Sequence, residues 1–322
     1  MSSRDVALAM TTLKDSPTML LFHAEMIPPI AASVGDDVQI SLPPMVPQGP
    51  LDSYDTFLAS RPPVFETCAI SSIISQASLA PNLQLHIVHL SAIEAIPLLQ
   101  QAQADGIKIS AETCFHYLTL ASEDVPVGDT RHKCCPPIRS TVNRNGLWEE
   151  LHRPNSVIQT IVSDHSPCTP VLKLLPSHLA SLTDPASKDA GDFFSAWGGV
   201  SSVGLGLPIL YTSALHSAPQ TTILDIVRWC CRNTAIQVGL AHKKGSIAPG
   251  MDADICVFDD EGSFVLGHEQ MLFRNKVSPY QGKTLKGVVK ETYVRGRSVF
   301  TRAGGFRDEK PSGELILEKR GL

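Results

Sequence analysis

The feature that most constrains the fold of this chain is the alternation of short apolar segments with helix-like segments. The apolar segments are rich in Leu, Ile and Val, are bounded by polar turns, and lie at residues 18–22, 83–90, 107–112 and 157–163. Helix-like patterns occupy residues 65–80, 92–104 and 145–151. Apolar strands separated by helices are typical of a parallel sheet covered on both faces. We therefore predict an α/β fold for this part of the chain.

Residues that can hold a metal or move a proton follow these predicted strands. Three of the four strands end in His23, His89 or Asp164, and the fourth is followed by Cys114 and His116. In parallel α/β structures, functional side chains gather at the C-terminal ends of the strands. Two imidazoles and a carboxylate are ligands suited to zinc or a similar divalent ion. We predict that His23, His89 and Asp164 bind a metal and that Asp164 takes a proton from the activated water.

Single histidines on apolar strands are more often structural than metal-binding. His86 and His89 are three residues apart on one predicted strand, so their side chains should point to opposite faces. Because His89 is nearer the C-terminal end, we expect His89 to face the site and His86 to pack outward. For His116, a core role and a site-lining role are equally open.

The pattern of residue types along the sequence changes near residue 243. From there the chain alternates β-forming residues with Gly turns, which predicts a small antiparallel β domain over 243–322 beside a larger domain over 1–242. Two long connections interrupt the larger domain. We expect a surface loop at 33–53 and, at 169–194, a segment that covers the site or moves.

Composition excludes several classes of function. The 322 residues carry a formal net charge of -5, and the basic residues form no stripe that would suit a nucleic acid. No signal-peptide pattern or membrane-length apolar run is present, so we expect a cytoplasmic protein that does not bind membranes. The eight cysteines are scattered without a CxxC pattern. This usage is typical of free thiols in a reducing compartment.

The ordered motifs of the chain resemble those of the allantoinases, cyclic amidohydrolases related to dihydroorotases and dihydropyrimidinases. These motifs include LLFHAEM, ASRPPVFE, LHIVHLS, KCCPPIR, VSDHSPC, AWGGVSS and KGSIAPGMDADICVFD. The resemblance implies a (β/α)8 barrel with a small β-sandwich domain and two zinc ions bridged by a carboxylated lysine. It also implies hydrolysis of the cyclic amide of allantoin to allantoate, a step of purine catabolism, by metal-activated water.

The same resemblance assigns roles to individual residues. It places His23 and His89 as metal ligands at the ends of barrel strands five and six, and Asp164 at strand eight. Ser166, Cys135 and Pro136 would contact the ureide ring of the substrate. Family members often have Ser or Asn where Cys135 stands, so the contact there would come from the backbone.

One part of the family pattern is not found in this chain. The family has a His-x-His pair on strand one and the bridging lysine on strand four, but the sequence contains no HxH, and only 22 residues precede His23. We therefore expect an N-terminally truncated chain with barrel strands five to eight, which holds at most one metal well. Such a half-barrel would have open edges, impaired activity and a tendency to form homo-oligomers.

Two alternatives to the allantoinase interpretation remain open at this point. The first is a non-catalytic scaffold of the amidohydrolase type, although retention of His23, His89 and Asp164 argues against it. The second is a single-metal hydrolase of the dihydroorotase or dihydropyrimidinase type, which acts on a related cyclic ureide or imide.

Overall fold

The computed structural model describes residues 2–28, 47–179, 188–307 and 313–317. The chain divides into two compact units. The first comprises Met1–Val203 with Phe273–Pro279, and the second comprises Gly204–Leu272 with Tyr280–Gly321. The predicted site residues all belong to the first unit. The expected domains 1–242 and 243–322 stay a prediction.

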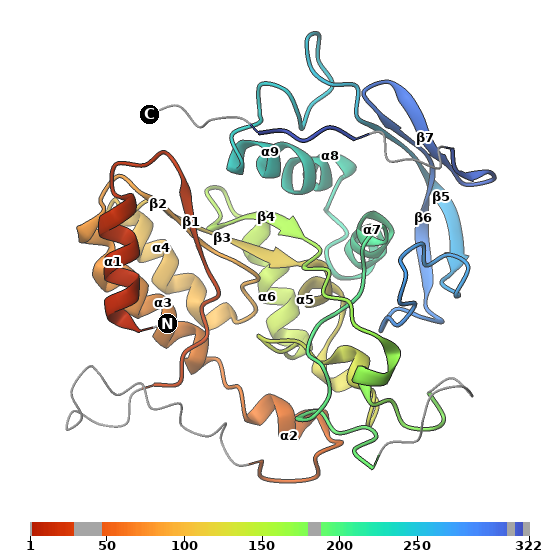
Figure 1. Ribbon diagram of the computed structural model, residues 1–322, viewed down its shortest axis with the longest axis horizontal. Helices are drawn as coiled ribbons and strands as arrows, with labels where there is room; N and C mark the ends of the chain where they lie inside the picture. The colour runs from red at the N-terminus through yellow and green to blue at the C-terminus, as the bar shows by residue number, and fades with distance from the viewer. Residues whose placement is uncertain (1, 29–46, 180–187, 308–312, 318–322) are drawn as a thin grey trace. The chain divides into compact units, whose positions relative to one another are not determined.

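A four-stranded parallel sheet forms the centre of the first unit (Figure 1). Its strands follow in chain order and are β1 (Met19–Phe22), β2 (Gln84–Ile87), β3 (Ile109–Cys114) and β4 (Ile158–Val162). Each strand overlaps one of the four segments predicted from the sequence, and the α/β prediction is confirmed. Because all four strands run in the same direction, their C-terminal ends meet at one edge of the sheet.

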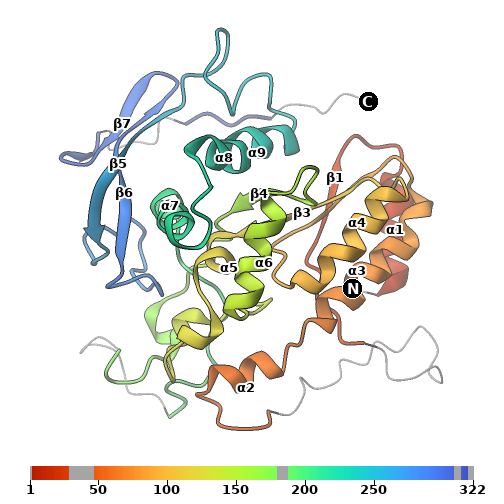
Figure 2. The ribbon, with the colours of Figure 1, turned by 180° about the vertical axis from the view of Figure 1, so that it is seen from behind.

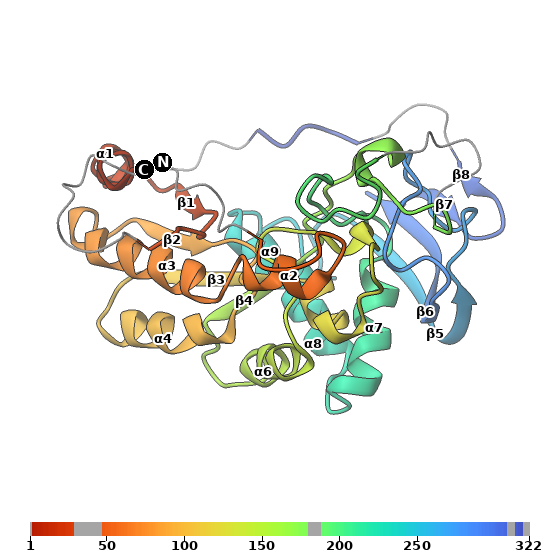
Figure 3. The same cartoon turned by 90° about the horizontal axis from the view of Figure 1, so that it is seen from below.

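Helices follow the strands and cover one face of this sheet. Figures 2 and 3 show α3, α4 and α6 together on that face. The helices of the first unit are α1 (Ser3–Leu13), α2 (Tyr54–Ala59), α3 (Val64–Gln76), α4 (Ile96–Ala104), α5 (Phe115–Thr119) and α6 (Thr141–Leu151). The start of α6 is fixed by Ser140, whose hydroxyl accepts a hydrogen bond from the backbone N–H of Asn143. Between strands and helices lies a core that includes Leu85, Ile87, Ile109, Leu99 and Leu147.

Short 3-10 helices complete the first unit. They are η1 (Ala77–Leu79), η2 (Ile93–Ala95), η3 (Ser122–Asp124), η4 (Thr130–His132) and η5 (Pro170–Lys173). Residues 33–46 of the predicted surface loop 33–53 lie outside the described residues.

The second unit contains an antiparallel sheet preceded by helices. The helices are α7 (Gly206–Ser217), α8 (Ile223–Val227), the π-helical η6 (Arg228–Arg232) and α9 (Asn233–Gln237). The strands are β5 (Ile255–Val265), β6 (Thr284–Val294), β7 (Arg297–Thr301) and β8 (Gly305–Phe306). They pair antiparallel in chain order, as the sequence pattern after residue 243 predicts. Within the described part of the chain, no helix has both the length and the apolar character needed to cross a bilayer.

Candidate metal and substrate site

His23 and His89 converge at the ends of neighbouring strands. His23 directly follows β1, His89 lies two residues after β2, and Nδ1 of His23 is 3.0 Å from Nε2 of His89. The rings meet edge to face with centroids 4.7 Å apart. Two facing imidazole nitrogens need either a shared proton or a shared cation. Burial, with His23 next to it, lowers the pKa of His89 to about 4, so at neutral pH this imidazole keeps the lone pair that a metal requires.

Glu25 fixes the orientation of His23. Its Oε2 atom lies 3.3 Å from Nε2 of His23 and 2.7 Å from Nη1 of Arg61. Although burial alone would raise the pKa of Glu25, its contacts with His23 and Arg61 outweigh that effect and lower it. A carboxylate that accepts the Nε2 proton leaves Nδ1 of His23 as the free lone pair directed at His89.

Asp164 lies beyond β4 and joins a second group of possible ligands. One atom each from Cys114, His116 and Asp164 lie within 4.8 Å of one another. Burial raises the pKa of Asp164, and the carboxylate of Glu112 raises it further. Proximity to a second carboxylate makes Asp164 a better proton acceptor than an ordinary aspartate.

His116 supplies an independent sign that this group fits a cation. The side chain is buried, and among the described residues neither ring nitrogen has a hydrogen-bond partner. Burial lowers the pKa of His116 to about 3, so the ring is neutral and offers a lone pair. Buried polar atoms without partners cost about 1–3 kcal/mol each. A metal ion would satisfy one of these nitrogens, and so the donors present are compatible with zinc.

The predicted ligands therefore fall into two groups. The structure brings His23 to His89 and brings Asp164 to Cys114 and His116. The three predicted ligands do not form a single compact group like the one around His116. Both groups lie at the C-terminal edge of the same parallel sheet, the first after β1 and β2 and the second after β3 and β4.

His89 and Asp164 share an uncommon backbone conformation. Each has a φ of 42°, in the left-handed region, although neither is glycine. This conformation costs about 1–2 kcal/mol per residue and is concentrated at functional sites. The same strained conformation therefore occurs at two strand ends that carry predicted metal ligands.

The prediction that His86 packs outward is wrong. His86 is buried, and its ring contacts Ser110 Oγ at 2.8 Å and Glu112 Oε2 at 3.2 Å on β3. Leu85 and Ile87, its neighbours on β2, belong to the core between strands and helices, so His86 lies on the opposite face of the sheet. Alternation of faces fails because β2 ends at Ile87, and the left-handed turn at His89 reverses the direction expected from spacing.

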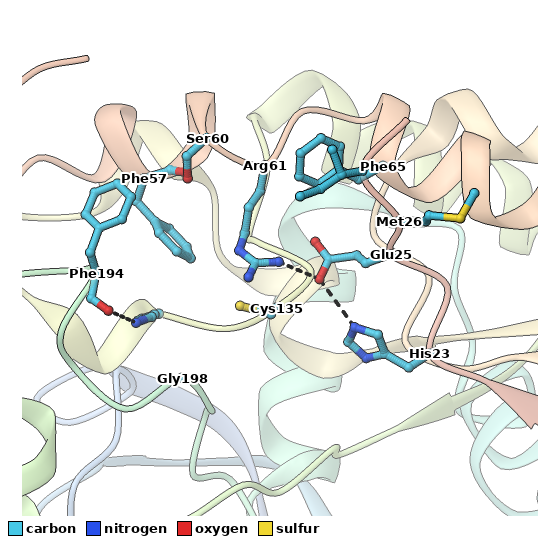
Figure 4. A pocket seen from close by; sticks show the side chains of 12 residues that line it. His23, Glu25, Met26, Phe57, Ser60, Arg61, Phe65, Cys135, Phe194 and Gly198 are labelled. Carbon is cyan, nitrogen blue, oxygen red and sulfur yellow. Dashed lines mark hydrogen bonds and ion pairs between the residues drawn. The ribbon is translucent and has the colours of Figure 1, made fainter. Parts of the chain in front are cut away.

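A pocket of about 580 Å³ opens beside His23 (Figure 4). Its walls include the charged side chains of Glu25, Arg61 and Lys133 and the aromatic rings of Phe57, Phe65 and Phe194. Of the predicted substrate residues, Cys135 lines this pocket. A volume of this size accommodates a small organic molecule.

The other two predicted substrate residues lie elsewhere in the same unit. Pro136 is buried, and its carbonyl accepts a hydrogen bond of 2.7 Å from the Tyr117 hydroxyl. Ser166 donates its backbone N–H to the Val200 carbonyl and packs against Gly199, where an added Cβ would lie 2.6 Å from the serine side chain. Gly199, with φ of 146°, is therefore required for this close approach. Substrate contact by these residues stays a prediction.

The sequence reasoning missed the roles of Arg61, Lys133 and Lys173. Arg61 stands in the motif SRPP between α2 and α3, far from the ligand strands in the sequence, so spacing gave no signal for it. Lys173 lies in the long connection 169–194 and is buried, with Nζ 2.6 Å from the Gly199 carbonyl and 3.0 Å from the Trp197 carbonyl. These two hydrogen bonds anchor the described part of the connection. No local pattern in the sequence predicts them.

Comparison with known proteins places the chain in a family. The sequence profile of the Amidohydrolase family matches residues 82–299. The chain belongs to the amidohydrolase family. Members of this family generally use a metal, typically zinc, which agrees with the donors gathered at the strand ends.

Curated relatives resemble the chain over most of its length. An allantoinase from Saccharomyces cerevisiae is 43% identical over 314 residues, which cover 97% of this chain and 61% of that protein. An allantoinase from Streptomyces avermitilis is 38% identical over 311 residues, with the same two coverages of 97% and 61%. The chain thus spans about 60% of the length of these relatives.

Solved structures agree on the fold. A D-hydantoinase (dihydropyrimidinase) from Thermus sp. matches 98% of this chain and 64% of its own, with a TM-score of 0.75 at 20% identity. The L-hydantoinase (dihydropyrimidinase) from Arthrobacter aurescens matches 80% of this chain and 53% of its own, with a TM-score of 0.67 at 25% identity. The chain therefore has the α/β, barrel-type fold of the amidohydrolases.

Proposed function

We propose that this chain carries metal-binding and substrate-binding parts of an allantoinase, which opens the cyclic amide of allantoin to give allantoate. The observation that carries the proposal is the convergence of His23 and His89 at adjacent strand ends, beside Asp164. The 43% identity to the yeast allantoinase supports the choice of substrate. We assign β1 to β4 to strands five to eight of the family barrel, and β5 to β8 to its small β domain.

The chemistry follows from the groups at the strand ends. A bound divalent metal would lower the pKa of a water molecule and polarise the substrate carbonyl. His23, through Nδ1, His89, through Nε2, and Asp164 would hold the metal. Asp164 also lies in the group with Cys114 and His116, so His116 would offer a further ligand nitrogen on the Asp164 side.

Asp164 moves the proton in this scheme. Its carboxylate takes a proton from the attacking water as the water oxygen bonds to the ring carbonyl carbon. The ring C–N bond then breaks, and Asp164 returns the proton to the leaving nitrogen. The carbonyl carbon ends as a carboxylic acid, which loses its remaining proton to solvent to give the carboxylate, so one water is consumed and no other reactant is needed. The raised pKa of Asp164 favours both steps.

The proposal is tested with the purified chain, zinc and allantoin. Allantoate formation should be detectable, and His89→Asn should lose it together with bound zinc. His216→Asn is the matched control, because His216 is exposed and lies on α7, which belongs to the second unit. Zinc content is measured by atomic absorption on each variant. Full zinc binding and turnover by His89→Asn would refute the assignment.

A further inference from the structure

The pocket beside His23 has a wall of cationic and aromatic side chains that metal binding alone does not explain. Two cationic side chains, Arg61 and Lys133, and the thiol of Cys135 lie in its wall, and all belong to the first unit. Figure 4 shows the Arg61 guanidinium between Glu25 and the Cys135 sulfur, with His23 beyond Glu25. A cation next to a hydrolytic centre can hold an anionic part of a substrate or product.

The pocket retains donors that its internal contacts do not use. The hydrogen bond from Arg61 to Glu25 uses a single nitrogen, Nη1, whereas a guanidinium has five N–H donors. Its side chain is 32% exposed and lines the pocket. Lys133 is more enclosed, and its Nζ donates to the carbonyls of Phe194 and Ala196 at 3.0 and 2.5 Å.

The charges of Arg61 and Lys133 both act on the thiol of Cys135 in the pocket wall. Burial raises the pKa of the Cys135 thiol, and Arg61 and Lys133 both oppose this rise. Their fields therefore overlap at the sulfur. Glu25 compensates one of the two positive charges, so the wall keeps a net positive charge.

The rest of the wall suits a planar, weakly polar group. Phe57, Phe65 and Phe194 line the pocket, and the Phe57 ring also lies 5.7 Å from the Lys133 ammonium. Aromatic faces stack on planar amides, and the ammonium above the ring is a cation–π contact. A ligand with a planar ureide and one carboxylate matches both parts of the wall.

We propose that this pocket is the product subsite, in which Arg61 binds the carboxylate of a ureido acid and Lys133 contributes long-range attraction. The inference rests on the proposed function, because opening a cyclic ureide creates a carboxylate that the substrate lacks. Arg61 thus distinguishes the acyclic, anionic product from the neutral ring. Glu25 competes with the product for the same guanidinium.

The test measures binding without turnover. N-carbamoylglycine, a small ureido acid, is titrated calorimetrically into the full chain after removal of metal with EDTA. Its neutral amide, N-carbamoylglycinamide, is the matched ligand. We expect the acid to bind more tightly than the amide. Because a charge-assisted hydrogen bond carries this preference, Arg61→Gln should weaken binding of the acid at least about tenfold and leave the amide unchanged.

A second variant should act in the opposite direction. Glu25→Gln removes the internal anion from Arg61, so the acid should bind more tightly than it does to the unmodified chain. This result cannot arise from loss of folding. Arg153→Gln is the matched control, because the Arg153 side chain is 62% exposed and lies outside the pocket. Binding to this variant should be unchanged.

Several results would overturn the proposal. One is equal binding of acid and amide, and another is an Arg61→Gln chain that binds the acid normally. A third is binding that appears only after zinc is restored and does not respond to Arg61, which would place the carboxylate on the metal. The proposed function fails separately, through absence of allantoate formation, because the titration needs neither metal nor catalysis.

Discussion

At the residue scale, the sharpest prediction concerns Asp164. In the proposed function, Asp164→Asn would remove the group that takes and returns the proton, and general acid–base groups contribute about 10²–10⁴-fold to rate. We expect kcat for allantoate formation to fall by about that factor. Asp260→Asn, an exposed acid on β5, is the control and should keep the activity of the unmodified chain. A kcat for Asp164→Asn within about threefold of the control would contradict the role.

A second residue-scale prediction concerns acid stability. Burial alone would raise the pKa of Asp129, but hydrogen bonds from Arg131 and His132 hold it far below its ordinary value of 3.8. A carboxyl with a depressed folded-state pKa stabilises the fold above its unfolded-state pKa and loses that contribution as pH falls. We expect the unfolding free energy to drop below about pH 4, and Asp129→Asn to reduce this drop. Urea unfolding across pH 2–6 would measure it, and parallel curves for both proteins would contradict it.

The sequence could predict that His23, His89 and Asp164 follow parallel strands, but not how these residues are turned. Apolar segments fixed the positions of His23, His89 and Asp164 relative to the parallel strands. The left-handed φ at His89 depends on tertiary packing, so spacing alone gave the wrong face for His86. Glu25 stands two residues after His23 in the sequence. Its role appears only when Arg61, 36 residues later, is brought to the same carboxylate.

At the element scale, Glu66 joins three segments around the site. Its Oε2 accepts the N–H groups of Ser91 and Ala92, just after His89, at 2.9 and 3.1 Å, and its Oε1 accepts from Arg139 at 2.7 Å. The pair is buried. Removing one partner of a buried ion pair costs about 3–5 kcal/mol. We expect Glu66→Gln to lower the unfolding free energy by about that amount.

The matched control for this prediction removes both charges. Glu66→Gln combined with Arg139→Met keeps an acceptor for the N–H groups and leaves no unpaired buried charge. Urea unfolding should therefore show the double variant to be more stable than Glu66→Gln alone. A double variant whose loss equals the sum of the single losses would show that the two side chains are not coupled.

A second prediction at the element scale concerns the effect of Lys173 on stability at alkaline pH. Burial lowers the pKa of Lys173 to about 8 from 10.5, while its Nζ holds the carbonyls of Trp197 and Gly199. Between these two pKa values the unfolded chain binds a proton that the folded chain does not. Stability contributed by this residue must therefore rise with pH from about 8 to 10.5, by at most about 3 kcal/mol.

The measurement compares the unmodified chain with Lys173→Met by urea unfolding at pH 7.5 and pH 10. The difference in unfolding free energy between the two proteins should change in favour of the unmodified chain at the higher pH. Taking this difference cancels the titration of Tyr and Cys, which both proteins share. A difference independent of pH would mean that Lys173 is charged in the fold up to pH 10.

Sequence patterns predicted these elements better than the contacts between them. The periodicity of residues 65–80 and 92–104 indicated helices because each buries a face against the sheet. Nothing local predicts that Glu66 of the first helix reaches the segment after the next strand. Lysine is rarely buried in protein cores, so nothing in the sequence indicated the burial of Lys173. Its burial depends on the carbonyl groups that the fold places around its ammonium group.

At the scale of the whole molecule, the parallel sheet of the first unit has two edge strands, β1 and β4. Within the described residues, β1 pairs only with β2 and β4 only with β3. Parallel strands are normally covered, and an uncovered edge is a template for pairing with another chain. Leu21 lies on β1 with 54% of its surface exposed. This combination favours association of the chain through β1.

We therefore expect the chain to associate in a concentration-dependent manner and Leu21→Lys to shift it toward the monomer. A charged side chain on an edge strand opposes pairing, because the charge would have to be desolvated in the contact. Sedimentation velocity from about 1 to 100 µM measures the distribution. Val142→Lys is the control, because Val142 is 74% exposed but lies on α6. If the unmodified chain sediments as a monomer throughout, or if both lysine variants act alike, β1 is not the contact.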